Sequence, residues 1–207
     1  MTHSYTTLEA AGMDTATAYR LLIGAVVPRP IAWITTKSKG GVVNAAPFSS
    51  YNYVAHSPPM VAVNIGTRDG ELKDTARNMV ETGEFVINVA TRETLEAMHG
   101  TSADYPPEAS ESEALGIELL PSHFVAPPRV AASPIQMECR LERALPLGRG
   151  LNTLYIGEVI AFHLSSQVFD GRYVDSVGMQ PISRLGGPQY AALGEIFERP
   201  RLTRPPI

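Results

Sequence analysis

The sequence has a single cysteine and no long apolar run. Cys139 has no partner for an intrachain disulfide, which is typical of proteins from a reducing cytoplasm. The longest apolar stretches, residues 21–28 and 60–65, are far too short to span a bilayer. The first residues contain neither a basic start nor an apolar stretch, so we expect no secretory signal. The sequence therefore predicts a cytoplasmic protein with no membrane partner.

The sequence has fewer positively than negatively charged residues. The chain has 17 Lys and Arg residues against 21 Asp and Glu, which gives a formal net charge of −4. Binding to nucleic acid relies on an excess of basic charge, so we expect no nucleic-acid partner. By contrast, 44% of the 207 residues are hydrophobic, which is enough for a globular core. We expect one domain over residues 1–207, with a frayed tail from about residue 200.

Several motifs for enzyme chemistry are missing as well. No GxGxxG follows a strand-like run, and there is neither a Walker A sequence nor a GxSxG elbow. The five histidines are scattered and lack the spacing of metal ligands, so we expect no metal site. The chemistry that remains is that of a bound organic cofactor.

The hydrophobic pattern predicts mostly short strands joined by turns. Strands are predicted over residues 31–36, 42–48, 60–66, 84–90, 135–145 and 154–164. Helices are predicted over residues 1–27, 70–83 and 93–99. For the second helix, Asp69 is the expected N-cap and Gly83 the expected C-terminal glycine. Strands joined by hairpins favour an antiparallel barrel with helices over its ends or edge.

The strand over residues 135–145 alternates strictly between apolar and polar side chains. Such alternation predicts one buried face and one solvent face, with Gln136 and Glu138 on the solvent face. Cys139 shares the apolar face, and we interpret it as a core residue and not a redox group.

Residues 100–133 interrupt the run of strands. They contain two Pro-Pro pairs and an acidic stretch, together with apolar residues such as Leu119 and Phe124. A long ordered loop of this kind is often a lid or a partner surface. We expect part of it to pack on the barrel or on a second subunit and to cover a ligand. The alternative is an insertion remote from the ligand.

One polar segment of the chain is suited to bind a phosphate. Arg68, Lys73 and Thr75 surround the start of the predicted second helix, where free amides and the helix dipole favour an anion. The alternative is that Arg68 and Lys73 pair with Asp74 and its acidic neighbours on a solvated helix face.

Two further segments have two interpretations each. Residues 49–52 supply donors and acceptors that could bind a flat heteroaromatic ring, or they form an ordinary polar bend. Trp33 follows Arg29, which Pro28 and Pro30 hold in an extended, exposed position. Trp33 is either a core residue or a cofactor contact.

Five motifs in a fixed order resemble one known family. They are PRPIAWITT at 28–36, NAAPFSSY at 44–51, PPMVAV at 58–63, KDTARNM at 73–79 and EFVIN at 84–88. The motifs EC at 138–139, IGEV at 156–159 and RLGGPQY at 184–190 also fit. Together they resemble the flavin reductase-like family, FMN-binding split barrels related to the reductase components of two-component flavin monooxygenases.

The resemblance implies a mainly β fold: a six-stranded antiparallel Greek-key split barrel with flanking helices. It implies a homodimer that binds FMN, rather than FAD, near the subunit interface and uses NADH or NADPH as co-substrate. The electrons would pass to a partner monooxygenase, to free flavin or to another acceptor. Two alternatives are a flavoprotein electron carrier and a flavin-binding protein without turnover.

The resemblance also implies a set of cofactor-binding residues. They are Arg29, Pro30, Ile31, Trp33, Pro47, Phe48, Ser49, Ser50, Tyr51, Asn64, Arg68, Lys73, Asp74, Thr75 and Tyr190. It places His163 near the nicotinamide, although a half-exposed strand histidine is the alternative. No catalytic side chain is required, because N5 of a flavin accepts a hydride directly.

Overall fold

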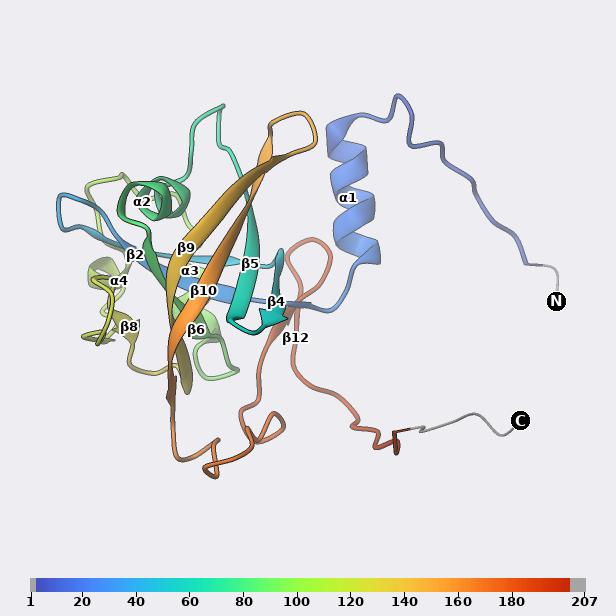
Figure 1. Cartoon of the computed structure of the whole chain (residues 1–207). Coiled ribbons are helices and arrows are strands. Elements are labelled where there is room, and N and C mark those ends of the chain that lie inside the picture. Colours follow the sequence, from blue (N-terminus) through green and yellow to red (C-terminus); the bar gives the residue numbers. More distant parts are fainter. Residues whose placement is uncertain (1–2, 202–207) are drawn as a thin grey trace.

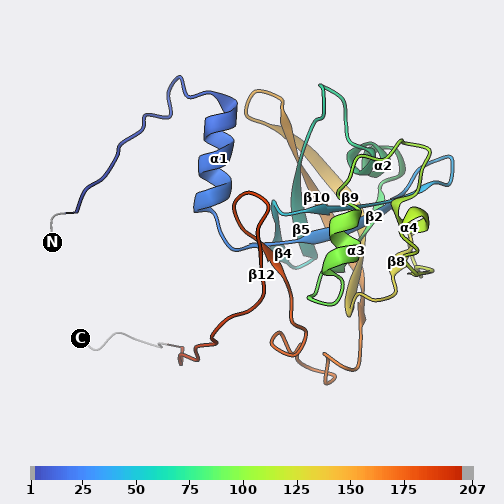
Figure 2. The same cartoon turned by 180° about the vertical axis from the view of Figure 1, so that it is seen from behind.

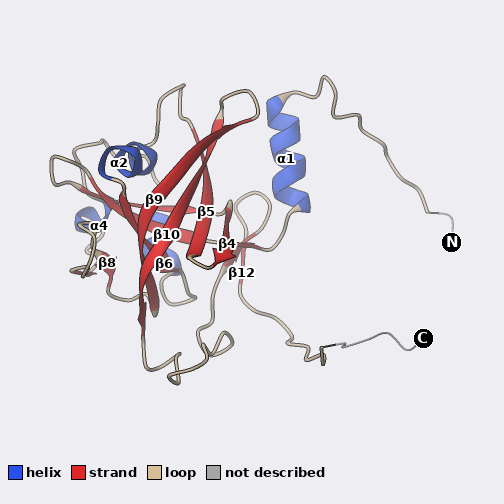
Figure 3. Cartoon of the chain, viewed as in Figure 1, coloured by secondary structure: helices blue, strands red, loops and turns tan. Residues whose placement is uncertain are grey.

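The computed structural model of the chain describes residues 3–201, and most of its ordered elements are antiparallel strands (Figure 3). The helices are α1 (Thr15–Ala25), α2 (Asp74–Thr82), α3 (Leu95–Gly100) and α4 (Glu111–Ala114). The strands are β1 (Arg29–Pro30), β2 (Ala32–Lys37), β3 (Val43–Phe48), β4 (Tyr51–His56), β5 (Pro59–Gly66), β6 (Glu84–Val89), β7 (Leu119–Leu120), β8 (Arg129–Val130), β9 (Ile135–Leu147), β10 (Asn152–Leu164), β11 (Ser183–Arg184) and β12 (Tyr190–Ala191).

Seven strands form one antiparallel sheet in the order β3-β2-β6-β9-β10-β5-β4. The long hairpin of β9 and β10 crosses the front of the molecule in Figure 1. The inner face of the sheet surrounds a core that includes Met79, Phe85 and Tyr155. This confirms the predicted mainly β split barrel. The sheet has one strand more than the expected six, because Tyr51–His56 pairs with β5 as an edge strand.

A second core covers the outer face of the sheet, and residues 100–133 supply part of it. Trp33 on β2 is 0% exposed and packs with Met98 of α3 and Val130 of β8. The side chain of Asn88 on β6 accepts a hydrogen bond from the Val130 N–H at 2.8 Å. Figure 2 shows α3, α4 and β8 on the side of the barrel that is seen from behind. Of the two surfaces expected for this segment, the structure shows packing on its own barrel.

Glu138 fastens the same segment to β9. Its side chain is fully buried, and its carboxylate accepts hydrogen bonds from the backbone N–H groups of His123, Phe124 and Val125 at 2.7, 2.6 and 3.1 Å. The predicted solvent face of this strand is therefore wrong at Glu138 and at Gln136, which is 6% exposed. The alternation is real, but residues 122–126 cover the polar face at that end of the strand.

Helix α2 begins four residues later than predicted. Asp69 has a left-handed φ of 50°, and Arg68 and Glu71 pair across a turn, so residues 70–73 are not helical. Asp69 is therefore not the N-cap. Gly83, with a φ of 74°, ends the helix as predicted, and its N–H donates to Met79 O. The helix buries a shorter apolar face than the sequence indicated.

Helix α1 lies beside the barrel in both views (Figures 1 and 2). It covers Thr15–Ala25 and not the predicted residues 1–27, and the side chain of Asp14 caps it by accepting from Thr17 N at 2.9 Å. None of its residues is buried. No helix within residues 3–201 is long and apolar enough to cross a membrane. The predicted tail lies almost wholly outside the described residues.

Candidate functional site

A groove with two connected cavities follows the end of β3 and the start of α2. The wide cavity has a volume of about 400 Å³, and the narrow cavity one of about 80 Å³. Pro47, Phe48, Lys73 and Ser102 line both, so the two cavities form one groove. The motif at 44–51 and the KDT segment therefore lie together, as the resemblance implied.

The narrow cavity lies against the start of α2. Lys73 is the N-cap residue, and no side chain caps the free amides of this helix end among the described residues. Thr75 is 1% exposed, and its Oγ1 accepts a hydrogen bond from Asn44 Nδ2 at 2.8 Å. Because that oxygen acts as the acceptor, the hydroxyl proton of Thr75 is available to a ligand. This end of the groove has the donors that an anion requires.

The charged side chains of the narrow cavity differ in their partners. Arg68 pairs with Asp104, and Asp74 pairs with Arg77. Lys73 forms no ion pair within residues 3–201. Burial, and next the charge of Arg68, lowers the pKa of Lys73. Arg68 and Asp74 do form surface ion pairs, but with Asp104 and Arg77 and not with each other, so the pairing expected as the alternative is absent from the described residues. The Lys73 ammonium can approach a ligand.

Arg29 in the wide cavity is not the exposed side chain that the sequence indicated. Its Nη1 donates to the carbonyl oxygens of Ile23 and Val26, both at 2.6 Å, and its Nη2 donates to Leu185 O at 2.9 Å. Its Nε lies 3.5 Å from Ser49 Oγ. Arg29 therefore joins the end of α1 to the turn after β11, and it borders the groove from that position.

Ten of the fifteen predicted cofactor-binding residues line the groove. They are Arg29, Ile31, Pro47, Phe48, Ser49, Arg68, Lys73, Asp74, Thr75 and Tyr190. Pro30, Trp33, Ser50, Tyr51 and Asn64 line neither cavity.

Three of these five residues have positions that explain the difference. Trp33 is completely buried, and its Nε1 donates to Thr101 Oγ1 at 3.0 Å, which supports the core interpretation. Tyr51 packs against the inner core, and burial raises its pKa. Asn64 is held by its backbone N–H, which donates to Ser50 O at 2.8 Å. Its Oδ1 is buried and has no hydrogen-bond partner within residues 3–201.

His163 lies outside the groove, so its position does not support the predicted place near a nicotinamide. Its Nε2 lies 2.6 Å from Glu138 Oε1 on the outer face of the sheet. Its ring meets the ring of His123 edge to face, with centroids 4.8 Å apart. The structure gives His163 a role in holding residues 122–126.

The sequence did not indicate His99 or Arg184, which line the wide cavity together with the predicted Tyr190. His99 Nδ1 lies 3.1 Å from the Tyr190 hydroxyl, and the Arg184 guanidinium lies 4.5 Å from the centroid of the Tyr190 ring. Tyr19 and Ser102 also line the groove. His99 and Tyr190 are 91 positions apart in the sequence, and no local spacing signal connects them.

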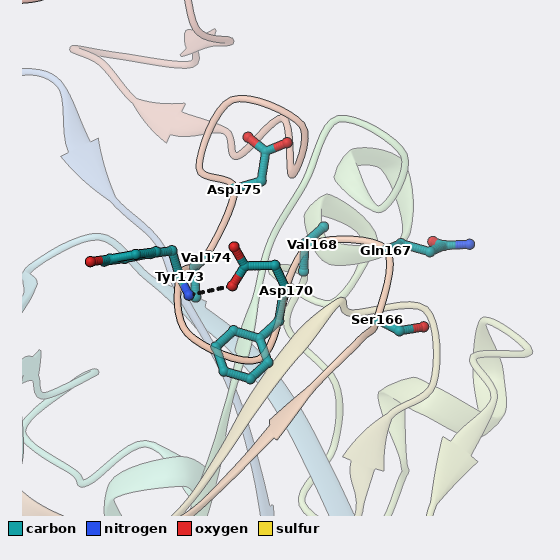
Figure 4. A pocket seen from close by; sticks show the side chains of 8 residues that line it. Ser166, Gln167, Val168, Asp170, Tyr173, Val174 and Asp175 are labelled. Carbon is teal, nitrogen blue, oxygen red and sulfur yellow. Dashed lines mark hydrogen bonds between the residues drawn. The ribbon is translucent and has the colours of Figure 1, made fainter.

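Another cavity lies in the loop after β10, and Figure 4 shows the side chains around it. Its volume is about 360 Å³, and all its lining residues come from one segment, 166–175. Asp170 closes this turn by accepting from the backbone N–H groups of Tyr173 and Arg172, which lowers its pKa. The other acid in this cavity, Asp175, accepts from the backbone N–H groups of Val177 and Gly178. Because both acids are engaged and no Lys or Arg lines the cavity, we do not assign it a ligand. Residues 3–201 contain no group of His, Cys, Asp or Glu suited to a metal ion.

Comparison with known proteins identifies the family. Residues 23–178 match the family described as flavin reductase like domain. An uncharacterized protein of Halalkalibacterium halodurans is 44% identical over 190 residues, which cover 89% of this chain and 91% of that protein. Nitrilotriacetate monooxygenase component B from Bacillus cereus has 38% identity and a TM-score of 0.92, over 96% of this chain and 100% of that structure. The 2-nitrobenzoate 2-nitroreductase NbaA of Pseudomonas fluorescens has 31% identity and a TM-score of 0.88, over 97% and 98% of the two chains. With three quarters of its length inside the matched region, the chain belongs to the flavin reductase-like domain family.

Proposed function

We propose that the chain is an FMN-binding oxidoreductase that takes electrons from NADH or NADPH and passes them to a partner protein, free flavin or another acceptor. The observation that carries this proposal is the groove that ends at the uncapped start of α2, beside a Lys73 without an ion-pair partner in the described chain. Membership of the flavin reductase-like family supports the same conclusion.

The donors of the groove fit FMN. The narrow cavity, of about 80 Å³, has room for one phosphate, and Lys73, Thr75 and the α2 amides would bind it. Phe48 and Ser49 would contact the ring or its side chain in the wide cavity, where Tyr190 forms part of the wall. When bound, FMN supplies a ring nitrogen that accepts a hydride, so the protein has to bind, orient and shield the ring.

The names of two similar structures support a redox function and two kinds of acceptor. One is named as component B of a monooxygenase, which supports a protein partner for this chain. The other is named as a nitroreductase, which supports a small nitro compound as the acceptor.

The test combines binding and turnover of the purified protein. We expect the absorption bands of bound flavin, either as isolated or after FMN is added and the excess removed. We also expect oxidation of NADH or NADPH that depends on FMN. FMN binding without oxidation of either nucleotide would instead identify an electron carrier or a flavin-binding protein without turnover. A protein with no measurable FMN affinity would refute the proposal.

A further inference from the structure

The narrow cavity contains a buried carboxylate without a cation partner. Glu111 is the first residue of α4 and is only 6% exposed. Its Oε2 accepts a hydrogen bond from Ala45 N on β3 at 2.8 Å. Its Oε1 accepts none from any other residue between 3 and 201, and no described Lys, Arg or His forms an ion pair with it.

The bond to Ala45 has a structural purpose, because it satisfies an outward N–H on an edge strand and attaches α4 to the barrel. That purpose requires only a neutral acceptor. Burial of the side chain disfavours its charged form, and no described cation offsets this effect. The other acid that lines the cavity, Asp74, is already paired with Arg77. Glu111 is therefore the acid that remains for a ligand.

A dianion could not lie beside this carboxylate without repulsion, but a ligand that carries a proton could. A phosphate monoester holds its last proton with a pKa of about 6, and its P–OH group is a strong donor to a carboxylate. The remaining phosphate oxygens could accept from Lys73 and Thr75, which line the same cavity. Burial raises the pKa of Glu111, against the effect of the Ala45 N–H, so a shared proton is held more readily.

We propose that Glu111 makes the narrow cavity selective for a phosphate monoester that carries a proton, an inference that rests on the proposed function. One proton lies between Glu111 Oε1 and the phosphate, and Lys73 and Thr75 bind the other oxygens. The linked phosphates of FAD hold no proton near neutral pH, and neither does sulfate. The cavity therefore binds FMN in preference to FAD and inorganic phosphate in preference to sulfate.

The first test uses the wild-type protein with inorganic anions. The protein is loaded with FMN at about pH 6.5, near the second pKa of a phosphate. Inorganic phosphate or sulfate is then added at equal ionic strength, and the displaced FMN is measured. We expect phosphate to compete at a concentration about tenfold or more below that of sulfate, because only phosphate can donate to Glu111. Equal competition by the two anions would overturn the inference.

The second test compares Glu111→Gln with Glu113→Gln, an exposed neighbour on the same short helix. Gln keeps an acceptor for the Ala45 N–H and removes the charge. We expect Glu111→Gln to reduce the preference for FMN over FAD, and for phosphate over sulfate, by about fivefold or more, since the amide can donate to either ligand. The affinity of Glu111→Gln for riboflavin should equal that of the wild type. Glu113→Gln should keep both wild-type preferences.

The experiments can refute the proposed function and the role of Glu111 separately. If the wild-type protein binds neither FMN nor riboflavin, the proposed function is wrong. If it binds FMN but both preferences stay the same in Glu111→Gln, the proposed function stands and Glu111 has only its structural role.

Discussion

At the residue scale, Lys73 combines partial burial with the lack of an ion-pair partner within residues 3–201. An ammonium group in that position is stabilised most by a ligand that carries negative charge. We expect Lys73→Ala to weaken FMN binding by about 1.5–3 kcal/mol, or tenfold and more, the range for a charge-assisted hydrogen bond. Riboflavin, which has no phosphate, should bind as before.

The measurement is a pair of titrations, with FMN and with riboflavin, on the same protein. Lys39→Ala is the matched control, because Lys39 is an exposed lysine in the turn between β2 and β3. A loss of the same size for both ligands would show that Lys73 supports the fold and not the phosphate.

At the scale of the elements, the attachment of residues 122–126 to β9 depends on the charged form of Glu138. Burial disfavours that form, but the N–H groups of His123 and Phe124, and next His163, outweigh this effect and hold the pKa of Glu138 below its ordinary value of 4.5. A carboxyl group whose pKa is lowered by folding stabilises the protein above its unfolded pKa. That contribution is lost as the pH falls through the folded value.

We therefore expect the free energy of unfolding to decrease as the pH falls below about 4.5, and Glu138→Gln to make this decrease shallower. At neutral pH the same variant should lose about 1.5–3 kcal/mol, because hydrogen bonds to a charged group are replaced by weaker ones. Denaturant unfolding over a series of pH values measures both effects. Glu142→Gln, a half-exposed acid on the same strand, is the control. An unchanged pH slope in Glu138→Gln would contradict the prediction.

Because residues 122–126 are attached to β9 in this way, we expect removal of residues 102–133 to destabilise the barrel. The sequence predicted a lid over the ligand, and a lid of this kind could be removed from a barrel that stays folded. In the structure this segment supplies donors to Glu138 and to Asn88, both fully buried. Its deletion would leave these groups without partners, which is costly. We expect a destabilised protein, so single substitutions such as Glu111→Gln are the better probes of its effect on the ligand.

The sequence predicted elements well where the pattern is local and less well where distant segments determine burial. The alternation along β9 correctly placed Met137 and Cys139 in the core. It could not show that residues 122–126 cover Glu138, since that contact depends on a segment outside the strand. The start of α2 was misplaced for a local reason, because the left-handed Asp69 interrupts an apparently helical spacing.

At the scale of the whole molecule, the groove was predictable only in part. The motifs at 44–51 and 73–79 identified the narrow cavity, because each lies within one continuous segment. The resemblance indicated Tyr190, but the wall that it forms with His99 and Arg184 was not predictable, since it joins α3 to the last strands of the chain. Trp33 shows the opposite error: a motif residue that is part of the core and not of the site.

The last prediction concerns a second copy of the chain, which we propose forms a two-fold dimer. Helix α1 buries none of its residues, and Tyr19, Leu22 and Val26 on or beside it are 62%, 63% and 57% exposed. Phe197 in the C-terminal segment is 65% exposed. Exposed apolar side chains along one helix are typical of an interface, and an obligate dimer would bury about 2,000 Å² or more in total. Because Tyr19 also lines the wide cavity, the partner subunit would lie close to the groove.

We expect sedimentation at micromolar concentration to show a dimer for the wild-type protein and a shift towards monomer for Leu22→Glu, since a charge in an apolar interface must be desolvated. Arg20→Gln, an exposed change on the same helix, should remain dimeric. Because the partner subunit would lie close to the groove, Leu22→Glu should also weaken FMN binding at concentrations where the wild type is dimeric. A wild-type monomer that binds FMN tightly would show instead that one chain forms the complete site.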